Sequence, residues 1–130
     1  MGDEIRFYFA AKYDKRQGML PLAAILMLHG HTVQADWLKG THEGENGSPK
    51  QWADIDLSDI DFCTHFVLFN LPVGEPDPSS GRHVEYGYAL AKKKTTIVVG
   101  GGESIFYEKA DLRYKTVDDF LAVFAKGDRL

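Results

Sequence analysis

The sequence has a single cysteine, no long run of basic residues and no apolar stretch long enough to cross a membrane. The lone thiol, Cys63, excludes an intrachain disulfide and fits a reducing compartment, so we expect a cytoplasmic protein. Acidic residues outnumber basic ones by 19 to 15, which argues against polymeric nucleic acid as a partner. The longest apolar run, 19–28, is interrupted by Pro21 and is too short to span a membrane, so no membrane association is expected.

The remaining composition is that of a globular protein. With 130 residues, of which 44% are hydrophobic, the chain is expected to form one domain, 1–130, with a buried core. The acidic first residues lead directly into an apolar pattern, so no secretory signal is expected.

Apolar runs alternate with helix-like segments along the chain. Strands are predicted at 5–10, 32–37, 66–71 and 95–99, with a short fifth strand at 105–107 or 112–114. Helices are predicted at 14–29, 51–63, 82–92 and 116–124. This alternation indicates an α/β protein, and we expect a flavodoxin-like three-layer sandwich whose mostly parallel five-stranded sheet has the order 2-1-3-4-5.

In such a sheet the loops after the first four strands converge at one edge, where ligands bind. Tyr8 lies near the end of the first strand, and segment 37–42 follows the second. Loop 72–81 follows the third strand and leads to Glu85, and a glycine triplet, 100–102, follows the fourth. We therefore expect these features to lie near one another.

Glu85 lies where a loop rich in proline, serine and glycine ends and an apolar helix begins. A carboxylate in the first helical turn can face the cleft, and the helix N-terminus favours its ionised form. Such a group can act as a nucleophile or as an electrostatic stabiliser. A solvated glutamate that complements the helix dipole is the alternative, and it is favoured until the rest of the chain is considered.

Three further side chains are candidates for the same cleft. Asp56 is one of four aspartates on a short helix, and most of the four are expected to be solvated. Beside Glu85, however, a carboxylate would complete the pair that acts at a glycosidic bond. Tyr8 is either a core tyrosine or a phenol that holds a carboxylate in place. His42 could contact a substrate, although a surface position is favoured.

The loop before Glu85 also offers groups that suit a phosphate or a sugar hydroxyl. Ser79, Ser80 and Gly81 supply hydroxyl and backbone N–H groups, and an N-cap is an equally good interpretation. Lys12, after the first strand, could add positive charge, although such residues are more often solvated.

The sequence offers little sign of a metal or a dinucleotide. His29 and His31 lack a third ligand at a fitting spacing, so no metal site is expected. The glycine triplet 100–102 has neither the spacing of the dinucleotide fingerprint nor the lysine of a P-loop. Cys63 precedes an apolar strand and is expected to be an inert core thiol.

Three segments, taken in order, resemble the nucleoside 2-deoxyribosyltransferase family and its phage-type relatives. Residues 7–11, FYFAA, resemble the family's opening I-Y-F-A/G segment. Residues 52–60, WADIDLSDI, followed by the apolar strand at 66–70, resemble its pattern A-x-x-D-L-x-x-I-x-x-A-D-h-h-h-h, where h is apolar. Residues 81–91, GRHVEYGYALA, resemble its G-x-x-x-E-x-G-x-A block. The ordered matches cover nearly the whole chain.

The resemblance implies a role for each matched residue. Glu85 would be the nucleophile that attacks the anomeric carbon of a deoxyribosyl group. Tyr8 would orient Glu85, and Asp56 would lie near the leaving base and help to protonate or hold it. The sugar would pass to water or to a second base, and no metal or organic cofactor would be needed. The family's members form homo-oligomers in which a neighbour closes the site, so a homo-oligomer is expected here too.

One departure from the family bears on the substrate. The transferases have an aspartate in the loop before the nucleophile, whereas this chain has Ser79 six positions before Glu85. The local pattern more closely resembles the branch that hydrolyses deoxynucleoside 5′-monophosphates, where a serine contacts phosphate. Asp77 is nearby and could take the place of the aspartate. The residues expected to bind substrate are Ser79, Ser80, Gly81, Arg82, Trp37, Lys12 and Asp77.

The sequence thus predicts an enzyme that cleaves the N-glycosidic bond of a (deoxy)nucleoside or nucleotide. A deoxynucleoside 5′-monophosphate N-glycosidase is an alternative within the same chemistry. A nucleotide-binding sensor without turnover is an alternative from another class, because flavodoxin-like sheets host many functions. In each case the partner is a small nucleoside or nucleotide.

Overall fold

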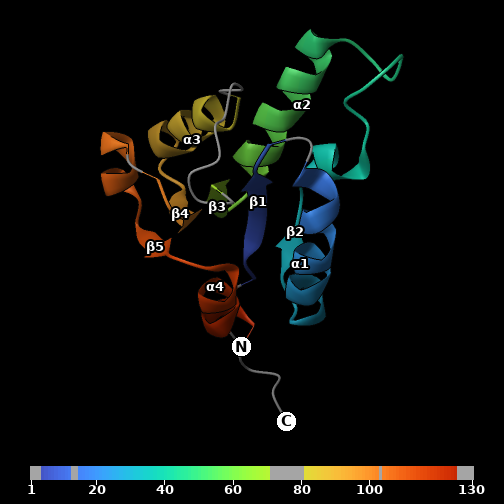
Figure 1. Cartoon of the computed structure of the whole chain (residues 1–130). Helices are drawn as coiled ribbons and strands as arrows, with labels where there is room; N and C mark the ends of the chain where they lie inside the picture. Colours follow the sequence, from blue (N-terminus) through green and yellow to red (C-terminus); the bar gives the residue numbers. More distant parts are fainter. Residues whose placement is uncertain (1–3, 13–14, 71–80, 103, 126–130) are drawn as a thin grey trace.

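The computed structural model describes residues 4–12, 15–70, 81–102 and 104–125. Figure 1 shows the path of the chain. The elements are β1 (Arg6–Ala10), α1 (Arg16–Leu28), β2 (Thr32–Val33), η2 (Asp36–Lys39), α2 (Pro49–Phe62), β3 (His65–Asn70), α3 (Gly81–Ala91), β4 (Thr95–Gly100), η3 (Ile105–Lys109), β5 (Leu112–Tyr114) and α4 (Val117–Phe124), where η is a 3₁₀ helix.

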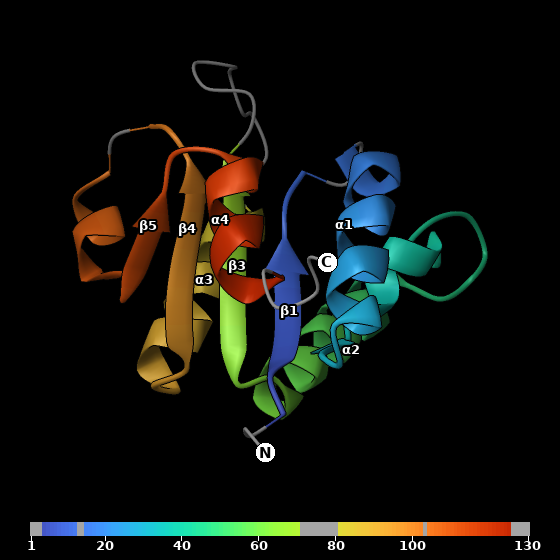
Figure 2. The same cartoon turned by 90° about the horizontal axis from the view of Figure 1, so that it is seen from below.

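The strands form one five-stranded sheet of order β2-β1-β3-β4-β5, in which every neighbouring pair is parallel. Helices α1 and α4 cover one face, and α2 and α3 cover the other (Figure 2). The expected flavodoxin-like three-layer α/β fold is therefore confirmed. Among the described residues, no helix is both long enough and apolar enough to cross a membrane.

Side-chain alternation along β1 decides which residues reach each helical layer. Phe7 makes edge-to-face ring contacts with Phe120 of α4, at 6.0 Å between centroids. Tyr8 points to the other face, where its ring stacks on Phe66 at 5.6 Å. Phe66 in turn contacts Tyr86 of α3 at 6.2 Å. Tyr8 therefore lies in the layer between the sheet and helices α2 and α3.

Helix α2 begins two residues earlier than the sequence pattern predicts. Ser48 is its N-cap and accepts a hydrogen bond from the backbone N–H of Gln51, while the Gln51 side chain accepts one from the Ser48 N–H. Pro49 occupies the first helical position, where its missing N–H costs nothing. This capping box fixes the start of the helix that carries Asp56.

The second strand is shorter than predicted. It ends at Val33, and the residues expected to extend it enter the 3₁₀ turn that contains Trp37. The carboxylate of Asp59 in α2 accepts the backbone N–H of Asp36 at 2.8 Å and the side-chain amide of Gln34 at 3.2 Å. These contacts draw the chain away from the sheet, so the prediction of a strand over 32–37 is wrong beyond Val33.

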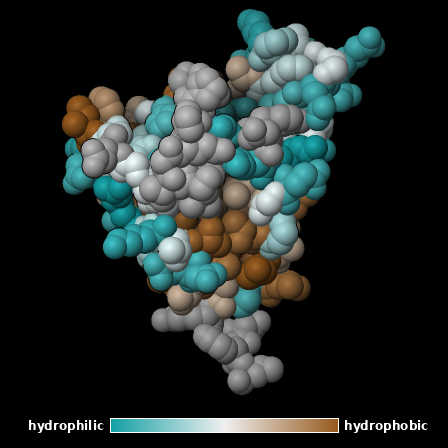
Figure 3. All heavy atoms as spheres, in the orientation of Figure 1, coloured by the Kyte–Doolittle hydropathy of each residue, from teal (hydrophilic) through white to brown (hydrophobic). Residues whose placement is uncertain are grey.

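The fifth strand lies at Leu112–Tyr114, one of the two positions that the sequence allowed, and the other position is part of η3. Figure 3 shows that apolar residues gather on the viewed face between α1 and α4, whereas hydrophilic residues cover α2 and the loop before it.

Candidate active site

Tyr8 and Glu85 are in direct contact. The Tyr8 phenol donates a hydrogen bond to Glu85 Oε1 at 3.1 Å. Tyr8 is fully buried, and Glu85 is half-buried. Because α3 as described begins at Gly81, Glu85 lies in the second turn of the helix rather than in the first turn predicted from the sequence.

Asp56 reaches the same point from α2 and shares a side-chain hydrogen bond with Glu85. On this helix Asp56, Asp59 and Ile60 follow the i, i+3, i+4 spacing of one face, which turns toward the sheet. The expectation that most aspartates are solvated holds for Asp54 and Asp61 but not for Asp59, which is only 8% exposed. Asp59 is instead the acceptor that shapes the turn after β2.

Burial dominates the electrostatics of this carboxyl pair. It raises the pKa of Glu85, together with the charge and hydrogen bond of Asp56, to about 8, although the Tyr8 hydrogen bond opposes the rise. Burial also raises the pKa of Asp56, against the hydrogen bond and charge of His42. The ionised Glu85 expected from the helix N-terminus is therefore not favoured, and near neutral pH the pair retains a proton.

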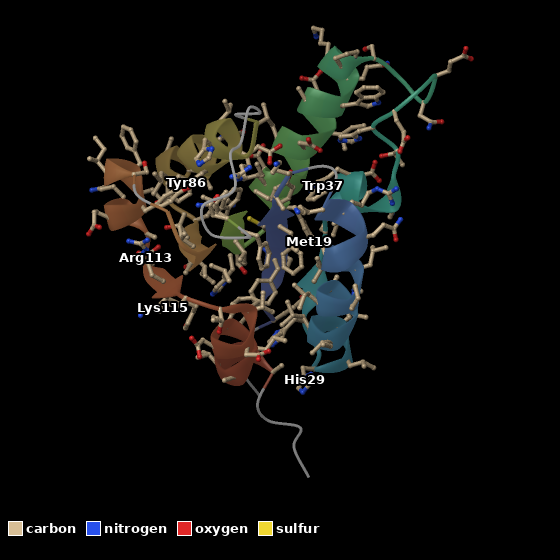
Figure 4. The ribbon with its side chains drawn as sticks, in the orientation of Figure 1. Met19, His29, Trp37, Tyr86, Arg113 and Lys115 are labelled. Atoms are coloured by element: carbon tan, nitrogen blue, oxygen red, sulfur yellow. The ribbon has the colours of Figure 1, made fainter. Side chains whose placement is uncertain are left out.

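These side chains border a cavity of about 370 Å³. The Trp37 indole N–H donates to the Phe9 carbonyl at 2.9 Å, so the turn after β2 is tied to β1 and the ring is held as an apolar wall. Figure 4 shows Trp37 above α1, near the carboxyl end of β1. The cavity is lined by Ala11, Trp37, His42, Asp56, Gly81, Arg82 and Glu85.

His42 belongs to the cavity, although the sequence favoured a surface position. Its side chain is 10% exposed, and its Nε2 lies 2.7 Å from Asp56 Oδ1. The ring stacks on Trp52 at 5.6 Å between centroids, nearly parallel at 8°. The sequence signal for it was its place in the loop after the second strand, beside the cleft of an α/β sheet.

Arg82 also lines the cavity. It is 6% exposed, and its Nη2 donates to Asn70 Oδ1 at 2.7 Å. The Asn70 amide in turn donates to the Gly101 carbonyl. A Cβ on Gly102 would lie 2.3 Å from Asn70 Nδ2, so the glycine triplet gives this amide the space it needs. The arrangement fixes a guanidinium beside the N-terminus of α3.

Comparison with known proteins gives a structural match but no sequence match. No family model and no curated protein matches the chain. Among solved structures, the CMP N-glycosidase BcmB of Clostridium botulinum matches with a TM-score of 0.63 and 23% identity, over 95% of this chain and 98% of that chain. The two proteins share a fold. At 23% identity, the match to BcmB shows a common fold and no more.

The other candidate residues are placed as follows. Lys12 is half-buried and follows Ala11, but it is not one of the residues that line the cavity. Ser79, Ser80 and Asp77 lie outside the described residues. Within the described part of the chain, no group of three or more His, Cys, Asp or Glu residues could hold a metal ion.

Proposed function

We propose that the protein is a nucleoside 2-deoxyribosyltransferase-like enzyme that cleaves the N-glycosidic bond of a (deoxy)nucleoside or nucleotide. The observation that carries the proposal is a pair of half-buried carboxyls beside a cavity: Glu85 shares a hydrogen bond with Asp56 and accepts one from the Tyr8 phenol. Paired carboxyls whose surroundings separate their protonation states are suited to nucleophilic and acid catalysis at an anomeric carbon.

In the proposed reaction, Glu85 acts as the nucleophile. It transfers its proton to Asp56, and a Glu85 oxygen then forms an ester with C1′ of the sugar while the C1′–N bond breaks. The electron pair of that bond goes to the base, which takes the proton from Asp56. Water or a second base attacks C1′ and releases Glu85, and the proton of the incoming group returns to the carboxyl pair.

The cavity is suited to this chemistry. Its volume, about 370 Å³, falls in the range of small-molecule sites. The Trp37 ring gives it a flat apolar wall, since the indole N–H is already bonded to Phe9. Such a wall suits a nucleobase, and the carboxyl pair suits the sugar carbon that joins the base.

The test of the proposal is base release by the wild type and by Glu85→Gln. A panel of nucleosides and 5′-monophosphates is incubated with and without free acceptor base, and the products are separated by chromatography. We expect the wild type to release base and Glu85→Gln to lose at least about 10³-fold in rate while still binding substrate. Binding without base release by the wild type, across the panel, would support the sensor alternative instead.

A 5′-monophosphate N-glycosidase is a second candidate, and Arg82 is the observation that favours it. A buried guanidinium beside a helix N-terminus suits a phosphate. The structural neighbour BcmB is a CMP N-glycosidase, so a related fold is used on a monophosphate. Arg82→Ala or Ser79→Ala should raise KM for a monophosphate and leave KM for the nucleoside unchanged. Lys50→Ala, which removes a positive charge from an exposed side chain at the start of α2, is the control.

The homo-oligomer implied by the family resemblance is also part of the proposal. The segment proposed to close a neighbour's site is 105–114, and light scattering of the purified protein measures its oligomeric state.

A further inference from the structure

His42 joins the carboxyl pair from the loop that follows β2 and η2. Its Nε2 lies 2.7 Å from Asp56 Oδ1, and both side chains are mostly buried, at 10% and 15% exposure. The imidazole is held in this plane by its stack on Trp52. Asp56 therefore lies between His42 on one side and Glu85 on the other.

The second nitrogen of the imidazole reveals where its proton lies. Thr41 Oγ1 donates its single hydrogen to Asp36 Oδ2 at 2.8 Å. The contact of 3.1 Å between Thr41 Oγ1 and His42 Nδ1 must then be a bond in which Nδ1–H donates. With Nδ1 protonated, the bond between Nε2 and Asp56 Oδ1 contains one proton, which belongs either to the ring or to the carboxyl.

We propose that His42 is a positioning residue for the reaction: the imidazole, fixed through Nδ1 by Thr41, holds Asp56 as a carboxylate, so that Asp56 can take the proton of Glu85 and deliver it to the leaving base. This inference rests on the proposed N-glycosidic cleavage. It assigns to the loop after β2 a part in proton transfer that neither carboxyl can supply alone.

The protons balance in this scheme. Glu85 loses a proton to Asp56 and becomes the nucleophile, and the same proton reaches the base as the C1′–N bond breaks. His42 keeps its own proton throughout, so the ring returns to its starting state without exchange with solvent. The hydrogen bond and charge of His42 lower the pKa of Asp56, so Asp56 is ionised before the step and gives up the transferred proton more readily to the base.

Other ionisable groups also act on the carboxyl pair. Burial and Asp56, on α2, raise the pKa of Glu85. The hydrogen bond from Tyr8, on β1, lowers it. The charge of Asp59, also on α2, opposes the effect of His42 on Asp56. Among the residues that the structure describes, the titratable groups with a printed contact or charge effect on the imidazole, its partners or the carboxyl pair include Asp36, Asp56, Asp59, Glu85 and Tyr8.

The first experiment measures how the rate depends on the leaving base. Substrates with one sugar carry bases made progressively more acidic by electron-withdrawing substituents, on whichever ring the wild type accepts. We expect His42→Gln to slow release of the unsubstituted base by about tenfold to a hundredfold, because general-acid catalysis of that size is impaired. The loss should shrink as the base becomes more acidic, since such a base departs without a proton.

A matched control separates this effect from damage to the loop. Gln51→Ala removes half of the capping box at the start of α2 but leaves the contact of His42 with Asp56 in place. It should leave the dependence on the leaving base as in the wild type. An equal loss for every base in His42→Gln would show that His42 is merely structural, and would overturn the inference.

The second experiment needs no turnover. The side-chain carboxyl of Glu85 is followed by ¹³C NMR while the pH is raised, in the wild type and in His42→Gln. Loss of the imidazole charge should move the titration of the carboxyl pair to higher pH, because that charge lowers the pKa of Asp56. An unchanged titration would overturn the inference even if base is released. A shifted titration without base release from the wild type would overturn the proposed function and, with it, the role of His42 in the reaction, and would leave only the effect of the imidazole on the carboxyl pair.

Discussion

The Tyr8 phenol donates a hydrogen bond to Glu85 across 77 positions of sequence, at 3.1 Å. The two residues meet because β1 pairs with β3, and α3 returns over the same face to lead into β4. A parallel sheet thus brings a first-strand side chain against a helix that follows the third strand. The phenol can stabilise Glu85 as a carboxylate without bringing a charge into the core.

Replacing Tyr8 by Phe should weaken Glu85 as the proposed nucleophile. The Tyr8 hydrogen bond lowers the pKa of Glu85, so its loss raises that pKa further and Glu85 holds its proton more tightly. We expect a rate lower by about tenfold to a hundredfold and a pH–rate limb displaced to higher pH. Tyr88→Phe is the control, because its phenol bonds Asp61 at the surface of the same helix. If the pH dependence of the rate is the same in Tyr8→Phe as in the wild type, the role proposed for Tyr8 is wrong.

Glu85 should make the protein less stable as the pH rises. Its pKa is raised from 4.5 to about 8 in the folded state, so between these values the folded chain holds a proton that the unfolded chain has lost. This contribution to stability is fully present below pH 4.5 and is lost as the pH rises through about 8. Its slope is at most about 1.4 kcal/mol per pH unit. Urea unfolding over this range measures it, and Glu85→Gln should remove this component.

Gly102→Ala should lower the stability of the fold, whereas Gly18→Ala should not. The backbone φ of Gly102 is +109°, and the added Cβ would lie 2.3 Å from Asn70 Nδ2. We expect a loss of roughly 1–3 kcal/mol in the free energy of unfolding, with weaker binding of a monophosphate because Asn70 holds Arg82. Gly18→Ala in α1, where nothing lies within 4 Å of the added atom, should raise stability by up to about 1 kcal/mol. Equal stability of the two variants would refute this account.

Cys63 should be unreactive in the folded protein. It is 1% exposed, and burial raises the pKa of its thiol to about 11. A thiol reagent at pH 8 should therefore label the native protein slowly and the urea-unfolded protein at once, because reaction requires an accessible thiolate. Rapid labelling of the native chain would show that the thiol is not buried in solution.

Much of the architecture follows from local patterns in the sequence. The alternation of strands and helices is enough to predict a parallel sheet and its strand order. Period-two alternation in β1 separates Tyr8 from Phe7 and so predicts which side chain reaches the layer of α2 and α3. The approach of Tyr8, Asp56 and Glu85 then follows from the connection of these elements.

What the sequence does not predict depends on contacts between distant residues. The turn at Trp37 forms because Asp59 accepts the backbone N–H of Asp36, and no local pattern reveals that bond. The protonation of Glu85 depends on burial by several elements at once, which outweighs the helix terminus that the sequence made prominent. The buried position of His42 is also not predicted by a local pattern, because it depends on contacts with Trp52 and Asp56.

The two carboxyls come from different helices of one layer, and α2 and α3 pack directly against each other. The packing of α2 against α3 therefore sets the distance between the two carboxyls of the proposed reaction. At the far end of this contact between the helices, Tyr88 of α3 bonds Asp61 of α2, and Lys94 bonds the backbone of the same residue. A sequence change there that slides one helix along the other would alter how the proton is shared while leaving every residue of the pocket intact.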